Sequence, residues 1–302
     1  MAQTFATHTN TFRVFPFPLH YFKTVCGPLQ AFRAFQPITS RMKVVPLALC
    51  VGVFLLQSSF LFAQNNDSSG TTVLEQALAA SGGRIAWTAL RDFRAAGTIA
   101  LHSGGNVTQS GGAELIGRGM KQFRLTADFR DHTRSWLWNK GFGRLDIGNG
   151  KPGLIGRHNL IALEGFNLPA LKLIAFSDGP SRSVTLVGTE TVEGIPAYRV
   201  RITRQGMNHE DRLVLGRASF QFDLLIDQKT FMVLAIEDTL YPNNQPEGAF
   251  QHRVEYSDYR SIAGTQIPFR ITETIAGQVT WDLHMETYVV NSGVPDSEFM
   301  PN

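Results

Sequence analysis

The chain has 302 residues, of which 43% are hydrophobic and 18% are charged, so it is long enough for a folded domain and too apolar for a disordered one. Its formal charge of +3 is unevenly placed, because five of the 28 basic residues and none of the 25 acidic residues lie in 1–63. The rest of the chain carries 23 basic and 25 acidic residues, about −2, which excludes the basic surface that nucleic-acid binding requires.

Residues 42–63 have the pattern of a secretory signal peptide: a basic start, the apolar run VVPLALCVGVFLLQSSFLFA at 44–63, and then polar residues. The alternative is that 44–63 stays uncleaved and anchors the chain in the inner membrane. Residues 1–41 are interpreted as an upstream extension, either a misassigned start or part of an extended leader. Both cysteines, Cys26 and Cys50, lie in this leader, so no disulfide is expected beyond it.

Short helices are predicted to open the folded part of the chain. A polar linker over 64–70 leads to Thr72–Glu75, which has the spacing of a capping box. The apolar residues that follow recur at helical spacing and predict a helix over 72–81. Gly82-Gly83 ends this helix, and a second short helix is expected over 84–90.

From Phe93 onward, apolar and polar residues alternate with the period of two that is typical of half-buried strands. The alternation predicts eleven or twelve strands, which lie near 93–101, 107–117, 122–130, Trp136 and Trp138, 144–147, 184–190, 196–204, 213–226, 231–239, 250–260, 265–276 and 279–290. The connections between them are short and rich in turn residues, namely Ser103–Asn106, Glu193-Gly194, Asp227–Thr230, Ala263-Gly264 and Ala276-Gly277. Such connections predict antiparallel neighbours.

Residues 152–178 interrupt the alternation, because they are apolar without a period of two and suit two short helices or an apolar loop. No composition break divides 71–302, which therefore predicts one domain. We expect a mainly β fold: a single curved antiparallel sheet that forms an incomplete, half-open barrel covered by short helices. The residues expected in this lid are Leu74, Leu78, Leu154, Ile155, Leu160, Ile161, Leu171, Ile174 and Phe176.

Three groups of polar residues are candidates for a chemical site. His158 and Glu164 are six residues apart, which does not place them on one face of a helix. The loop His209–Asp211 offers possible metal ligands, and Asp282, His284 and Glu286 alternate along one strand. Each group is also explained as a solvated loop or strand face, and the usual catalytic and nucleotide-binding motifs are absent from the sequence. We therefore expect no catalytic residue, no metal and no cofactor.

The apolar strand faces are more informative than the polar groups. They carry more large side chains than one thin helical layer needs to cover, which favours a concave surface that encloses a hydrophobic ligand over a plain core. The residues expected to line this surface are Phe123, Leu125, Trp136, Trp138, Tyr198, Val200, Phe220, Phe222, Leu224, Ile271, Trp281, Leu283 and Met285.

Four segments in this order resemble the LolA-like proteins of the bacterial envelope: ALAASGGRIAWTALRDFRAAGTI (77–99), VEGIPAYRVRI (192–202), FDLLIDQKTFMVLAIE (222–237) and VEYSDYRSIAGTQIPFRI (254–271). That group includes the lipoprotein carrier LolA, the sensor RseB and the mycobacterial LppX-type lipid carriers. The resemblance covers most of 71–300 and implies an incomplete barrel whose concave apolar face is covered by helices. No functional residue of the family is assigned to a position of this chain.

The leading hypothesis is a periplasmic or secreted carrier that binds acyl chains of a lipid or lipoprotein without catalysis. The first alternative is a sensor or protein-interaction module of the same fold, with an envelope protein as partner. The second is an envelope hydrolase that uses Asp282, His284 and Glu286 or the loop at His209. Transient contact with a membrane is compatible with the first hypothesis, and nucleic acid is not expected as a partner.

Overall fold

The computed structural model describes residues 68–119, 121–155, 159, 167–177, 182–204, 221–241 and 248–300. All of them belong to one compact unit, which spans Phe60–Asn302. The predicted leader, the extension before it and the loop His209–Asp211 lie outside the described residues, and so these interpretations stay predictions. Among the described residues, no helix combines the length and apolar content that a bilayer crossing requires.

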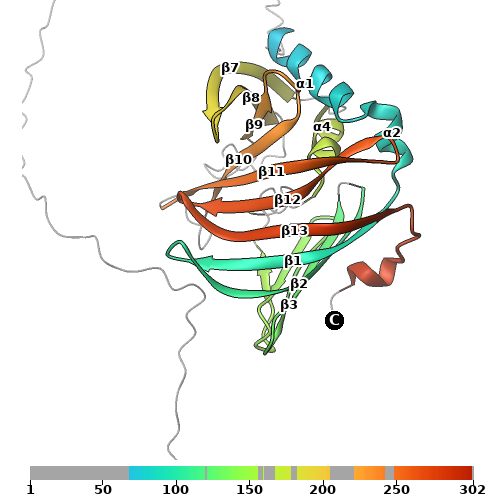
Figure 1. Ribbon diagram of the computed structural model, residues 1–302, viewed down its shortest axis with the longest axis vertical. Helices are drawn as coiled ribbons and strands as arrows, with labels where there is room; N and C mark the ends of the chain where they lie inside the picture. Colours follow the sequence, from blue (N-terminus) through green and yellow to red (C-terminus); the bar gives the residue numbers. More distant parts are fainter. Residues whose placement is uncertain are drawn as a thin grey trace, which may run out of the picture. The chain divides into compact units, whose positions relative to one another are not determined.

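The alternating segments form one antiparallel sheet of thirteen strands, in the spatial order β6-β5-β4-β3-β2-β1-β13-β12-β11-β10-β9-β8-β7 (Figure 1). The strands are β1 Phe93–Ser103, β2 Asn106–Arg118, β3 Gln122–Asp128, β4 Thr133–Asn139, β5 Phe142–Asp146, β6 Gly153–Ile155, β7 Arg182–Val192, β8 Ile195–Arg204, β9 Gln221–Asp227, β10 Val233–Leu240, β11 Phe250–Ile262, β12 Thr265–Ile275 and β13 Gln278–Val290. The edge strands β6 and β7 do not pair with each other, so the sheet stays open. The predicted mainly β fold with an incomplete barrel is confirmed.

Two-residue turns join five pairs of neighbouring strands, and their sequences explain why. In each of them the two central residues have positive φ, as a type I′ turn requires, and the second is glycine. The turns are Gly104-Gly105, Lys140-Gly141, Glu193-Gly194, Ala263-Gly264 and Ala276-Gly277. Four of the five connections predicted from the sequence thus contain a turn whose backbone matches the twist of the strands. The fifth, after Asp227, is held by the Asp227 side chain, which accepts hydrogen bonds from the Lys229 amide and the Thr230 hydroxyl.

The helices are α1 Ser68–Ala80, α2 Gly83–Ala89, α4 Pro169–Ser177 and the short 3-10 helix η5 Asp296–Phe299. Helix α1 begins four residues before the predicted capping box, so residues 68–70 are helical and not part of a linker. Helix α1 packs closely on β7, because a Cβ at Gly70 would lie only 2.8 Å from the Leu186 amide nitrogen. The junction of α1 and α2 is attached to the start of β12, where the Gln266 amide donates to the Ser81 carbonyl at 2.8 Å.

The apolar insert 152–178 is only partly helical. Its described residues form the strand β6 and the helix α4. Leu154 pairs with Arg144 on β5 and is 76% exposed, so its assignment to the lid is wrong. The cause is the pleat of the sheet: Leu154 points to the face opposite its neighbour Ile155, which does pack against the core.

The face of the sheet covered by α1, α2 and α4 is named the inner face, and the opposite one the outer face. Most buried apolar side chains form one cluster on the inner face, from β4 on one side to β7 on the other, and the three helices add Val73, Ala77, Trp87 and Leu171 to it. Helix α1 contacts β7, β8 and α4, and helix α2 contacts α4 and β12. The helices therefore bury the inner face of a sheet that would otherwise expose it.

The C-terminal segment packs on the outer face. Phe299 is fully buried in a second, smaller apolar cluster with Ile116 and Leu137. Beside it, the Glu298 carboxylate lies between two arginines, Arg94 at 2.8 Å and Arg124. These contacts attach the C-terminal segment to the outer face of β1 to β4.

Replacing Glu298 by glutamine should lower the free energy of unfolding by about 0.5–1 kcal/mol, because partly exposed ion pairs contribute no more than this. Urea unfolding monitored by tryptophan fluorescence would measure the change. The matched control is Glu286→Gln, an exposed carboxylate on the same face, with an expected change within about 0.5 kcal/mol. Equal effects of the two substitutions would contradict the role of the Glu298 pairs.

Candidate ligand-binding face

The structure brings the side chains predicted to line a concave surface into one place. Of the thirteen residues, ten are buried in the inner-face cluster and two, Trp136 and Tyr198, pack against it. Phe220 lies outside the described residues. The buried ten are Phe123, Leu125, Trp138, Val200, Phe222, Leu224, Ile271, Trp281, Leu283 and Met285. Whether they hold a ligand stays a prediction.

Cross-strand register explains why these residues meet. Phe123 on β3 pairs with Trp138 on β4, and their rings lie 6.0 Å apart. Ile271 on β12 likewise pairs with Leu283 on β13. Since directly paired residues share a face and every second residue along a strand returns to it, one apolar pair fixes the face for the whole hairpin. Reading the period of two in the sequence was therefore sufficient to find this surface.

The lid residues are placed less completely. Leu171 is buried in the cluster, and Leu74, Leu78, Ile155 and Ile174 pack against it. Leu160, Ile161 and the side chain of Phe176 lie outside the described part of the chain. Sequence reasoning missed the largest fully buried side chain of the lid, which is Trp87. Its ring is 1% exposed, and its indole nitrogen donates to the Ser81 carbonyl at 3.0 Å and to the Ser81 hydroxyl at 3.1 Å.

A buried lysine lies within the lid. Lys172 on α4 is 1% exposed, and its Nζ lies 4.3 Å from the ring centroid of Phe222 on β9. This geometry is a cation–π contact. The sequence gives little sign of it, because a lysine flanked by leucines in a short helix is normally assigned to the solvated side.

A charged group on the inner face was also missed. His252 on β11 lies between two carboxylates: its Nδ1 is 2.7 Å from Asp238 Oδ1, and its Nε2 is 3.1 Å from Glu273 Oε1. The side chains of His252 and Asp238 are each 1% exposed. We name these three residues the ionic triad. Its sequence signal is the alternation of His252 with the buried Val254 and Tyr256, which places the imidazole on the apolar face.

The ionic triad carries net charge. Burial by itself would lower the pKa of His252, but the charge of Asp238 and the hydrogen bonds to Asp238 and Glu273 outweigh burial and raise the pKa to about 10. His252 is therefore an imidazolium at neutral pH. With two carboxylates beside one imidazolium, the triad has a formal charge of about −1 in an apolar setting.

The polar row on β13 faces the other way, as the alternation predicted. Asp282 accepts two hydrogen bonds from Arg270, at 3.0 and 2.9 Å, and one from the Thr272 hydroxyl at 2.8 Å. Although burial alone would raise it, these hydrogen bonds lower the pKa of Asp282. His284 and Glu286 are exposed on the outer face. Among the described residues no group of three or more potential ligands is arranged for a metal ion, while His158, Glu164 and His209–Asp211 lie outside them.

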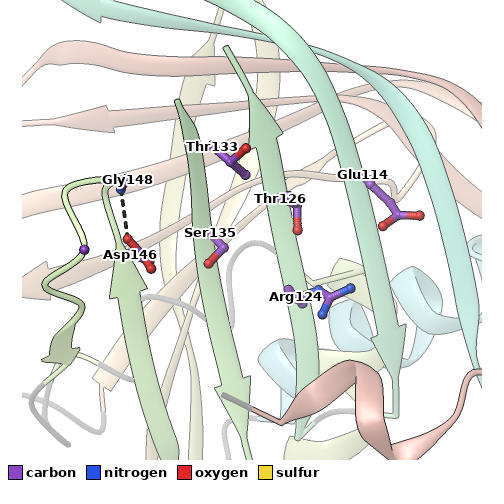
Figure 2. Close-up of a pocket in the computed structure, with 8 residues that line it drawn as sticks. Glu114, Arg124, Thr126, Thr133, Ser135, Asp146 and Gly148 are labelled. Atoms are coloured by element: carbon purple, nitrogen blue, oxygen red, sulfur yellow. Dashed lines mark hydrogen bonds between the residues drawn. The ribbon is translucent and has the colours of Figure 1, made fainter. Parts of the chain in front are cut away.

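The outer face carries a shallow polar hollow of about 490 Å³ across β2 to β5 (Figure 2). Its floor is one cross-strand row, and Arg124, Thr133, Gly148 and Gly150 surround the row Glu114, Thr126, Ser135 and Asp146. The Asp146 carboxylate accepts a hydrogen bond from the Gly148 amide at 2.9 Å. The lining is polar, so the hollow offers no surface for an acyl chain.

No protein-family model and no curated protein matches this sequence. Several solved structures are similar to it. A LolA superfamily protein from Nitrosomonas europaea is 14% identical, with 77% of this chain and 97% of that chain covered and a TM-score of 0.47. An outer membrane lipoprotein-sorting protein domain from Vibrio parahaemolyticus is 11% identical, with 76% and 96% covered and a TM-score of 0.47.

A DUF1329 family protein from Desulfovibrio piger is 12% identical, with 78% of this chain and 98% of that chain covered and a TM-score of 0.44. Of these three structures, the Nitrosomonas europaea protein carries the name of the group that the sequence resembles.

Proposed function

We propose that this protein binds the acyl chain of a lipid or lipoprotein between the inner face and the helices α1, α2 and α4, and that it does so as a carrier without catalysis. The observation that carries the proposal is the continuous apolar inner face. The predicted cavity residues meet on this face, and the helices α1, α2 and α4 cover it. The signal-peptide pattern of 42–63 supports a place in the periplasm or outside the cell.

The energy available to such a ligand is large. Burying an acyl chain contributes about 0.8 kcal/mol per methylene, so a chain of about 16 carbons offers roughly 12 kcal/mol before costs. The inner-face side chains contact the lid and one another. A ligand must replace those contacts, so the net gain is smaller and binding requires the helices to move away from the sheet.

A disulfide between lid and sheet tests this requirement. A Cβ placed at Gly264, in the turn between β11 and β12, would lie 4.0 Å from the Cβ of Ala86 on α2. That separation suits a disulfide. We expect the oxidised Ala86→Cys/Gly264→Cys protein to take up a fluorescent fatty acid at least about tenfold more slowly than its reduced form, because α2 can no longer leave the turn. Stopped-flow fluorescence measures the rate.

The experiment uses the full chain with Cys26 and Cys50 replaced by serine, so that no other thiol is present. The single variant Gly264→Cys is the control for backbone strain, since Gly264 has a φ of +83°. Equal uptake rates with and without reductant would show that the lid near α2 does not open for the ligand.

A protein-interaction module is the second candidate. It is favoured by the packing of the inner face, since its large side chains are buried against one another and against the helices. Native mass spectrometry of protein purified from a membrane-rich lysate separates the two. Bound lipid supports the carrier, whereas protein free of lipid that also fails to bind the fatty-acid probe supports the interaction module.

A further inference from the structure

The ionic triad lies where a ligand on the inner face would reach it. Asp238 lies two residues after the core residue Ile236 on β10, and Glu273 lies two residues after the core residue Ile271 on β12. Alternate residues of a strand share a face, so both carboxylates point to the inner face. Glu273 is also paired with Trp281 on β13, one of the side chains expected to line the ligand surface. The three charged groups therefore border the apolar surface and do not belong to the outer face.

One carboxylate oxygen of the triad has no hydrogen-bond donor among the described residues. Both ring nitrogens of His252 are engaged, and Glu273 Oε2 accepts a hydrogen bond from the Thr280 hydroxyl. Asp238 Oδ2, in contrast, is buried and has no hydrogen-bond partner in the described part of the chain. A buried carboxylate oxygen without a donor is costly, and removing that cost favours a donor brought in from outside.

The charge of the triad limits what this donor can be. A group that meets Asp238 Oδ2 must donate a hydrogen bond, and a positive charge on it would balance the excess negative charge of the two carboxylates. A carboxylate at the same place would neither donate a hydrogen bond nor be attracted. An ammonium group at the end of an apolar chain satisfies both conditions.

We propose that Asp238, His252 and Glu273 form a head-group site that receives the ammonium group of an amphiphile whose chain lies on the inner face. The site rests on the proposed function and makes it more specific: it favours ammonium over neutral heads and disfavours carboxylate heads. A second cation, Lys172, lies on the same side of the sheet but over Phe222 on β9, whereas the triad spans β10 to β12. A ligand head group would therefore meet a positive charge near β9 and a negative charge at the triad.

Three ligands with the same chain test the site: dodecylammonium, dodecanol and dodecanoate. Each displaces the neutral dye N-phenylnaphthylamine from the full-length protein at pH 7, and the fall in fluorescence gives its affinity. We expect dodecylammonium to bind at least about tenfold more tightly than dodecanoate, with dodecanol between them. In Asp238→Asn the ratio should fall below about threefold, because the amide removes one negative charge and keeps the shape.

Asp282→Asn is the matched control, since Asp282 is a half-buried, hydrogen-bonded carboxylate on the outer face, and its ratio should equal that of the unmodified protein. Near-ultraviolet circular dichroism shows whether Asp238→Asn folds. If it does not, the affinity ratio is measured in Glu273→Gln, which removes one negative charge and keeps the Asp238–His252 pair.

The outcomes separate the two proposals. If neither the dye nor any dodecyl ligand binds the unmodified protein, the proposed function fails. If all three ligands bind with similar affinity, the function stands and the head-group site is wrong. A preference for ammonium that persists in Asp238→Asn, or in Glu273→Gln where that variant decides, overturns the assignment of the site to these residues.

Discussion

Replacing His252 by alanine should lower the free energy of unfolding by about 3–5 kcal/mol, the usual cost of removing one partner from a buried ion pair. The substitution leaves Asp238 and Glu273 close together without a positive charge between them. It also opens a space in a part of the core where the imidazole is 1% exposed. Urea unfolding at pH 7, with tryptophan fluorescence and circular dichroism as probes, measures the difference.

The same residue predicts a dependence on pH. The pKa of His252 is about 10 in the folded protein and about 6.5 when unfolded, so folding favours the protonated form. Its contribution to stability is fully present below pH 6.5 and is lost as the pH rises through 10. We therefore expect the urea midpoint of the unmodified protein to fall between pH 7 and pH 10.

Buried tyrosines contribute to that fall near its upper end, because burial raises the pKa of Tyr256 and Tyr288 above its value in the unfolded chain. The difference between the unmodified protein and His252→Gln cancels their effect and isolates the imidazolium. That difference should shrink steadily from pH 7 to pH 10. His284→Ala, an exposed histidine on β13, is the control and should change stability by no more than about 0.5 kcal/mol. A constant difference across this range would show that His252 is neutral in the folded protein.

Replacing Phe222 by alanine should cost about 3–5 kcal/mol, the range for removing a fully buried aromatic side chain. Phe222 is 1% exposed, pairs with Ile202 on β8 and lies beneath the ammonium group of Lys172. The substitution removes packing on the inner face and the cation–π contact of Lys172 together. Differential scanning calorimetry and urea unfolding measure the loss.

Phe142→Ala is the matched control, because Phe142 is 40% exposed on the outer face and its loss should change stability by no more than about 0.5 kcal/mol. Phe222→Ala should also weaken binding of the fatty-acid probe under conditions where the variant remains folded. A cost below about 1 kcal/mol would mean that the inner face is loosely packed without ligand. Unchanged probe affinity would remove Phe222 from the ligand surface.

Local patterns predicted most of the sheet. Alternation identified twelve segments that are strands in the structure, at least in their described parts, and the face that each presents, because a strand side chain points to one of only two sides. It missed β6, whose three residues are too short for a period to be visible. It also placed the start of α1 at Thr72, since a capping box signals a helix start only when no earlier residue is already helical.

The sequence by itself determined the open antiparallel sheet, the apolar side of its strands and the outward direction of Asp282, because these follow from the pleat and the turns of neighbouring residues. Only the tertiary structure decided how charges meet inside it. Asp238, His252 and Glu273 are 14 and 21 residues apart along the chain, and they come together because β10, β11 and β12 are adjacent in one particular register. A pattern read along one strand cannot show a partner on the next, and that is why the buried ionic triad and Lys172 emerge only when the strands and the helices are packed together.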